Sequence, residues 1–190
     1  MKKILMISGK VLLFTAGLIF AFYMFMPYRE LGNLAVSLGS ARLSRMGMKL
    51  NYSDVSGEKD GFTVHNMRLS GITELSMSSV TVRPMFSASI LSLSPVCEIE
   101  FKGCNVRFGQ NINIGDGGFL LTAGNEILLE NLRSNGEFSL NGYITIDTGT
   151  MKIGHADARL EVPEYFSQNM GMLRNFLPLV QEGGKWYLRR

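Results

Sequence analysis

Both cysteines of the chain lie in one short stretch, CEIEFKGCNVRF, which runs from Cys97 to Phe108. Two cysteines this close could form a disulfide, a redox pair or part of a metal site. On one extended strand Cys97 and Cys104 would be roughly 23 Å apart, at about 3.3 Å per residue. A disulfide needs Cα atoms within about 7 Å of each other, and a shared metal is excluded by the same distance. We therefore interpret both cysteines as small, buried, apolar side chains.

The other residues that could do chemistry lack partners at the spacing that catalysis or metal binding needs. His65 and His155 lie in alternating segments with polar neighbours, which favours exposed strand histidines over general bases. The chain has no Gly-x-Ser-x-Gly elbow and no His-Glu-x-x-His zinc motif. GDGGF, residues 115–119, lacks the Lys-Ser/Thr pair of a phosphate loop, so we interpret it as a turn. We predict no catalytic residue, no cofactor-binding residue and no metal ligand, and hence no enzyme.

The positive charge of the chain is concentrated at its start. The formal net charge is +3, and Lys2, Lys3 and Lys10 account for all of it. The rest of the chain has equal numbers of basic and acidic residues and no basic stripe, which argues against nucleic-acid binding.

Residues 1–27 read as a membrane segment. An almost continuous apolar run from Ile4 to Met26 would span roughly 34 Å as a helix, enough to cross a bilayer. The run is long for a cleaved signal peptide and no small-x-small cleavage site follows it, so we favour an uncleaved signal-anchor. The lysines favour a cytoplasmic N-terminus, which in a bacterial cell would place residues 28–190 in the periplasm as a β-rich domain.

A short amphipathic helix is predicted over residues 28–47. Leu31, Leu34, Leu38 and Ala41 recur at helical spacing, and we expect this stripe to pack on the domain. Binding of the helix to a membrane surface or to a partner remains an alternative.

Residues 48–162 are predicted to form strands. Apolar residues alternate with polar ones in short runs, separated by Gly, Asn, Ser and Asp. This pattern is typical of an antiparallel sheet with one buried face and one exposed face. Only FSASILSLSP, within residues 86–95, departs from it, as a short helical turn or a loop.

The apolar phase shifts by one residue at three places in these runs, His65-Asn66, Lys102-Gly103 and Glu130-Asn131. Either a β-bulge or a two-residue hairpin turn produces such a shift. None of the three pairs is a strong hairpin pair, which favours bulges in longer strands. At Lys102-Gly103 a hairpin turn would also pair apolar residues with each other, so we keep it as an alternative there.

Residues 163–182 are predicted to form a helix. Pro163 suits its first turn, and the residues that follow place an apolar stripe on one face, namely Phe166, Met170, Leu173 and Leu177. We expect this stripe to pack on the sheet, with a partner groove as the alternative. Pro178 and Gly183-Gly184 would end the helix, and residues 184–190 would form a last strand.

Several of these segments resemble one known family. DVSG and GFTVHNMRL, followed by LSMSSVTVRP, resemble the type II secretion system protein N family, which is related to AsmA-like proteins. FSASILSLSPVCEIEFKG, FSLNGYITID and FLPLVQEGGKWYL resemble later helices and strands of that family. The resemblance covers about residues 10–188.

The resemblance implies a mainly β fold, in which an N-terminal transmembrane helix precedes a curved antiparallel β-sheet domain with short flanking helices, of the AsmA-like type. It implies a non-enzymatic accessory component of a type II secretion system, anchored in the bacterial inner membrane, with other secretion-system proteins as partners. The alternative that it implies is an AsmA-like lipid-handling module that binds phospholipid.

Overall fold

The structure is a computed structural model that describes residues 14, 17–18, 21, 25–71, 73–108, 110–150, 152–163, 166, 178–183 and 185–189. Within these residues, no helix combines the length and the hydropathy needed to cross a bilayer. Most of the segment predicted as a signal-anchor, residues 1–27, lies outside the described residues.

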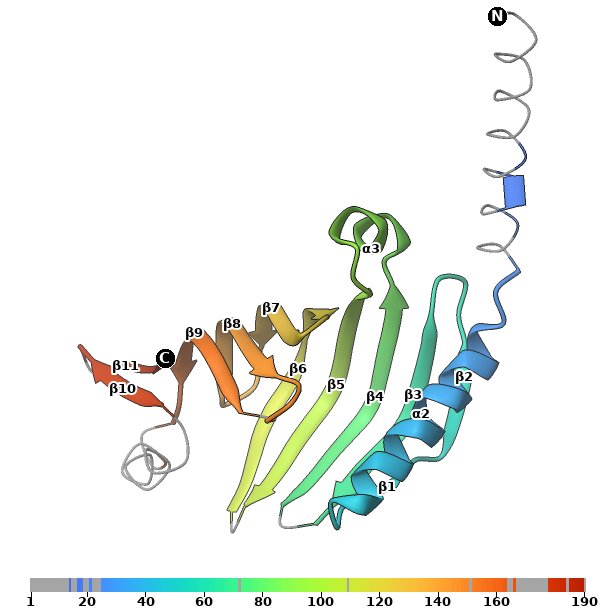
Figure 1. Cartoon of the computed structure of the whole chain (residues 1–190). Coiled ribbons are helices and arrows are strands. Elements are labelled where there is room, and N and C mark those ends of the chain that lie inside the picture. The colour runs from blue at the N-terminus through green and yellow to red at the C-terminus, as the bar shows by residue number, and fades with distance from the viewer. Residues whose placement is uncertain are drawn as a thin grey trace, which may run out of the picture.

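One antiparallel sheet dominates the fold (Figure 1). Its strands are β1 (Lys49–Asn51), β2 (Asp54–Gly57), β3 (Phe62–Ser70), β4 (Glu74–Pro84), β5 (Val96–Phe108), β6 (Gln110–Ala123), β7 (Glu126–Ser134), β8 (Ser139–Asp147), β9 (Ile153–Glu161), β10 (Leu179–Glu182) and β11 (Lys185–Arg189). Their order is β1-β3-β4-β5-β6-β7-β8-β9-β11-β10, and β2 also pairs with β3. Two helices accompany the sheet, α2 (Tyr28–Arg45) and α3 (Phe86–Ser92). The mainly β fold with short helices is confirmed.

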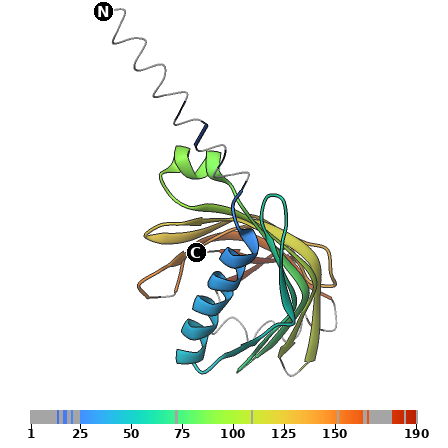
Figure 2. The same cartoon turned by 90° about the vertical axis from the view of Figure 1, so that its right-hand side faces the viewer.

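The two faces of the sheet differ in polarity. Side chains alternate along each strand, so residues that are partners in register share a face. Val82, Ile99 and Phe119 are successive partners across β4, β5 and β6. Their chain neighbours Arg83 and Glu98 are partners on the opposite face. One face is therefore apolar and the other polar. The sheet is curved, and α2 lies on its concave side (Figure 2).

Most of the buried hydrophobic residues form two clusters, one toward each end of the sheet. The first joins α2 to β2 and β3, and its buried members are Tyr28, Val36, Val55, Phe62 and Val64. The second lies on β9, β10 and β11, and its buried members are Ala156, Ala158, Phe166, Leu179, Trp186 and Leu188. Phe166 meets Phe138 edge to face, with 4.8 Å between the ring centroids.

Of the predicted stripe on α2, Leu31 packs against the first cluster, but the other three residues do not. Leu34 and Leu38 are 57% and 63% exposed, and Ala41 is exposed as well. The helix instead buries Gly32, with Tyr28 and Val36 one turn to either side of it. A Cβ atom on Gly32 would lie 2.7 Å from Val55 and 2.8 Å from Phe62, so the missing side chain lets the helix approach the strands closely. Helical spacing favours the leucines because it carries no information about how closely the helix approaches the strands.

Two further predictions need correction. GDGGF is not a turn, because residues 115–119 lie inside the long strand β6. The predicted helix over residues 163–182 is wrong at its end, because Leu179–Glu182 forms β10 and pairs with β11. Residues 164–165 and 167–177 lie outside the described residues. A strand also forms where the last one was predicted, as β11.

Candidate functional site

The two core clusters leave the apolar face in the middle of the sheet incompletely covered. Val80, Ile99, Phe101, Leu121 and Leu129 all point to this face and are only half-buried. Helix α2 packs on β1, β2 and β3, at one end of the sheet. The central strands therefore present an apolar lining between the clusters.

Local kinks in the backbone keep this lining continuous along each strand. Asn66, Gly103 and Asn131 have φ angles of 51°, 60° and 52°, in the left-handed region. Each is the second residue of a pair at which the sequence predicts a phase shift, and at each the strand continues, so none is a hairpin turn.

At two of these three sites the pairing also changes register. The register shifts between Phe101 and Cys104 on β5 and between Leu129 and Leu132 on β7, where one extra residue is inserted. At Asn66 the register with β4 is the same before and after the kink. The prediction of bulges is thus confirmed at Lys102-Gly103 and Glu130-Asn131. Each extra residue returns the next apolar side chain to the inner face.

Polar side chains bridge the kinked positions on the outer face. Ser78 Oγ donates a hydrogen bond to the main-chain oxygen of Lys102 over 2.8 Å. The Gly103 amide donates to the Asp116 carboxylate, and the Asp116 amide donates to Oδ1 of Asn135, each over 2.8 Å. These bonds satisfy main-chain and side-chain groups where the regular ladder is interrupted.

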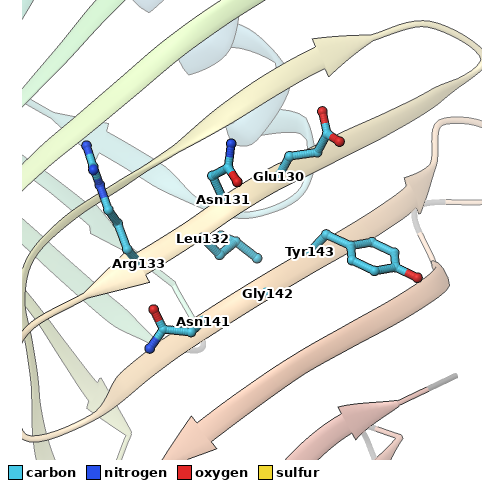
Figure 3. Close-up of a pocket in the computed structure, with 7 residues that line it drawn as sticks. All are labelled: Glu130, Asn131, Leu132, Arg133, Asn141, Gly142 and Tyr143. Carbon is cyan, nitrogen blue, oxygen red and sulfur yellow. The ribbon is translucent and has the colours of Figure 1, made fainter.

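A shallow depression of about 500 Å³ opens on the polar face at the bulge of β7 (Figure 3). Its lining residues are Glu130, Asn131, Leu132, Arg133, Asn141, Gly142 and Tyr143. A second depression, of about 420 Å³, shares Asn131 and Arg133 with it. The lining offers a carboxylate, a guanidinium, amides and a phenol, without a nucleophile beside a base. Such groups are typical of a hydrogen-bonding contact surface.

An ion-pair network covers the polar face beside these depressions. Nη1 of Arg83 donates a 2.7 Å hydrogen bond to Oε2 of Glu100, and Arg83 also lies within 4 Å of Asp60 and Glu98. Arg133 approaches the other oxygen of Glu100 at 3.9 Å. The hydrogen bond to Glu100, together with the surrounding carboxylates, raises the pKa of Arg83 above its ordinary value.

The cysteines are where the strand pattern predicts them. Cys97 and Cys104 lie on β5 as free thiols, and both belong to the apolar face. Cys104 is buried and Cys97 is half-buried. Burial raises the pKa of Cys104 to about 11 and raises that of Cys97 as well, so both thiols are protonated at neutral pH. The interpretation as a buried apolar side chain is confirmed for Cys104, whereas Cys97 lies on the same face but is only half-buried.

The two histidines are on the polar face of the sheet, far apart in the strand order. His155 is exposed on β9. His65 on β3 is half-buried, and its Nε2 lies 3.0 Å from Oγ of Ser56. Ser56 Oγ also points to the main-chain oxygen of Thr63 at 3.5 Å, across the β2–β3 pair. Among the described residues, no three His, Cys, Asp or Glu side chains are grouped to hold a metal ion.

Comparison with protein families identifies a match that spans nearly the whole chain. Residues 6–190 match the profile of a family described as type II secretion system protein GspN-like, Synergistales. No curated protein and no solved structure matches the chain.

Proposed function

Since the chain belongs to the type II secretion system protein GspN-like family, we propose that it is a non-enzymatic accessory component of a type II secretion system, anchored in the inner membrane. The observation that carries this proposal is the extent of the match, which covers residues 6–190 and so includes most of the N-terminal run as well as the sheet.

The sequence of the N-terminal segment supports the proposed anchoring and the proposed location of the sheet domain. The apolar run from Ile4 to Met26 is long enough to cross a bilayer, and Lys2 and Lys3 precede it. With the lysines in the cytoplasm, the sheet domain lies in the periplasm. Its polar face, with the Arg83 network and the depression at the β7 bulge, is then available to other secretion-system proteins.

Purification of the native membrane complex, combined with deletion of the gene, tests this function. We expect secretion-machinery proteins to co-purify with the full chain and secretion to fall in the deletion strain. A matched control replaces residues 1–27 with a cleaved signal peptide, which exports the sheet domain without an anchor. If nothing of the machinery co-purifies and secretion is intact after deletion, the proposal is wrong.

Lipid handling is a second candidate function, supported by the half-buried apolar lining between the two core clusters. Leu121 and Thr122 are adjacent on β6 and point to opposite faces. A photo-crosslinking amino acid at position 121 should capture phospholipid in cells, whereas the same group at position 122 should not. Equal labelling at both positions, or at neither, would argue against lipid on the inner face.

A further inference from the structure

The connection between β4 and β5 is an apolar protrusion with no charged residue. It reads MFSASILSLSP, residues 85–95, and contains the two-turn helix α3. Ile90, Leu91 and Leu93 are 66%, 86% and 91% exposed. By contrast, only Gly124 and Asn125 connect β6 to β7. The protrusion is therefore an addition that the sheet itself does not need, and it presents aliphatic side chains to the outside.

The backbone conformation of Leu93 indicates that its side chain does not serve packing within the protein. Leu93 caps α3 in the left-handed region, with a φ of 52°. That position is usually occupied by Gly or Asn, because other side chains are strained there. The Leu93 side chain is almost fully exposed, so packing within the protein does not offset the strain.

Two serine hydroxyls of the protrusion form hydrogen bonds to nearby main-chain groups. Ser89 Oγ donates to the main-chain oxygen of Met85 over 2.8 Å and accepts from the amide of Val96 over 2.9 Å. Ser92 Oγ donates to the main-chain oxygen of Ala88 over 2.8 Å. A segment in contact with lipid must satisfy its polar groups internally, and these serines do so.

The protrusion extends beyond the end of β4 and the start of β5, and α2 begins on the same side of the molecule, as both views show (Figure 1, Figure 2). Tyr28, the first residue of α2, directly follows the predicted anchor over residues 1–27. A bilayer that holds the anchor is therefore on the side toward which α3 projects. Phe25, beside the start of α2, is 86% exposed and adds to the apolar surface at this end.

We propose that the α3 protrusion contacts the same bilayer as the anchor, with Ile90, Leu91 and Leu93 entering the boundary between head groups and acyl chains. The inference rests on the proposed anchoring. A second contact with the bilayer would fix the sheet's tilt and distance from the membrane. A protein partner fits less well, because stable interfaces bury about 800 Å² per partner and centre on Trp, Tyr or Arg.

The depth of position 91 tests the proposal in the full chain. The protein is reconstituted in phosphatidylethanolamine–phosphatidylglycerol vesicles, with and without brominated acyl chains. The native Trp186 is the single tryptophan and is buried. A Leu91→Trp variant should show blue-shifted emission that the brominated chains quench. As control, Tyr143→Trp, at an exposed site on the polar face, should emit equally in both vesicles. Unquenched, solvent-like emission from position 91 would overturn the proposal.

A second variant separates lipid contact from structural support. Leu93→Gly relieves the strained cap, so it should raise the urea midpoint of unfolding. In the Leu91→Trp background the same change should reduce quenching. Higher stability with unchanged quenching would show that Leu93 makes no lipid contact, and would remove it from the proposal.

Extraction of the vesicles with alkaline carbonate separates this inference from the proposed anchoring. Release of a protein whose position 91 is quenched at neutral pH would contradict the anchor and support the protrusion. Retention of a protein whose position 91 is unquenched would support the anchor and contradict the protrusion. A protein that never associates with the vesicles contradicts both.

Discussion

The main-chain amide of Gly103 on β5 donates a hydrogen bond to Oδ1 of Asp116 on β6, with 2.8 Å between the two atoms. Gly103 is the left-handed residue of the β5 bulge, so this bond holds the bulge against the neighbouring strand. The bulge in turn keeps Phe101 and Cys104 on the same apolar face.

Replacement of Asp116 should loosen this bulge. We expect Asp116→Ala to lower the free energy of unfolding by about 1 kcal/mol, the usual contribution of a hydrogen bond. Asp157→Ala is the control, because the Asp157 carboxylate forms an exposed ion pair with Arg189 at 3.6 Å, and its loss should change stability little. Urea denaturation measures both. Equal losses in the two variants would contradict a specific role for the Gly103–Asp116 bond.

Substitution of two glycines of α2 by alanine should change the stability of the protein in opposite directions. A Cβ on Gly32 would overlap Val55 and Phe62, so Gly32→Ala should destabilise the protein by about 1–3 kcal/mol. Nothing lies within 4 Å of a Cβ on Gly39, so Gly39→Ala should stabilise it by about 0.5–1 kcal/mol through helix propensity. Thermal unfolding followed by circular dichroism measures both. Stabilisation by Gly32→Ala would refute the close packing of α2.

The buried thiol of Cys104 should make stability depend on alkaline pH. Its pKa is raised to about 11 in the folded protein from 9.0, so folding favours the protonated form. The stabilising contribution is complete below pH 9 and is lost as the pH rises toward 11. Wild type should therefore lose more stability than Cys104→Ala between pH 8 and pH 10.5, as measured by urea denaturation. Parallel declines would show that Cys104 ionises as freely in the folded state as in the unfolded state.

Arg83 should contribute more to stability than Arg107, a largely exposed arginine of the same face. Arg83→Gln leaves Asp60, Glu98 and Glu100 without their shared cation, and we expect a loss of about 1 kcal/mol. The matched variant Arg107→Gln removes one contact of 3.9 Å and should cost almost nothing. The difference should shrink at about 1 M salt, where charges are screened. A salt-independent loss would point to packing of the Arg83 side chain instead.

The sequence predicts the strands well because each needs only local alternation. It also locates the kinks at Asn66, Gly103 and Asn131, since an inserted residue shifts the apolar phase whatever surrounds it. The depression at the β7 bulge follows from one of these kinks, but its outline depends on Asn141 and Tyr143 of the neighbouring strand. Register between strands is not visible in a single segment.

The wrong predictions share a physical cause, which is that contacts between distant segments of the chain determine the structure at those places. Gly32 determines which face of α2 is buried, through Val55 and Phe62. Gly117 lies inside β6, where a side chain would overlap the main-chain oxygen of Arg133 and the ring of Phe101. These neighbouring strands require glycine there, so a glycine that suggests a turn in the sequence belongs to a strand. Leu179–Glu182 is a strand because β11 pairs with it.

The strand order has a consequence for how the protein folds. Apart from the β1–β3 and β9–β11 pairs, every pair joins two strands that follow each other in the chain. Several of these pairs are joined by short connections, such as Gly124-Asn125 between β6 and β7, so little loop entropy is lost as those hairpins close. The sheet can therefore assemble by successive addition of hairpins, faster than all-β folds that depend on distant pairings. A central hairpin can also be gained or lost in evolution without rearranging the others, so sheet width can change while both terminal clusters are kept.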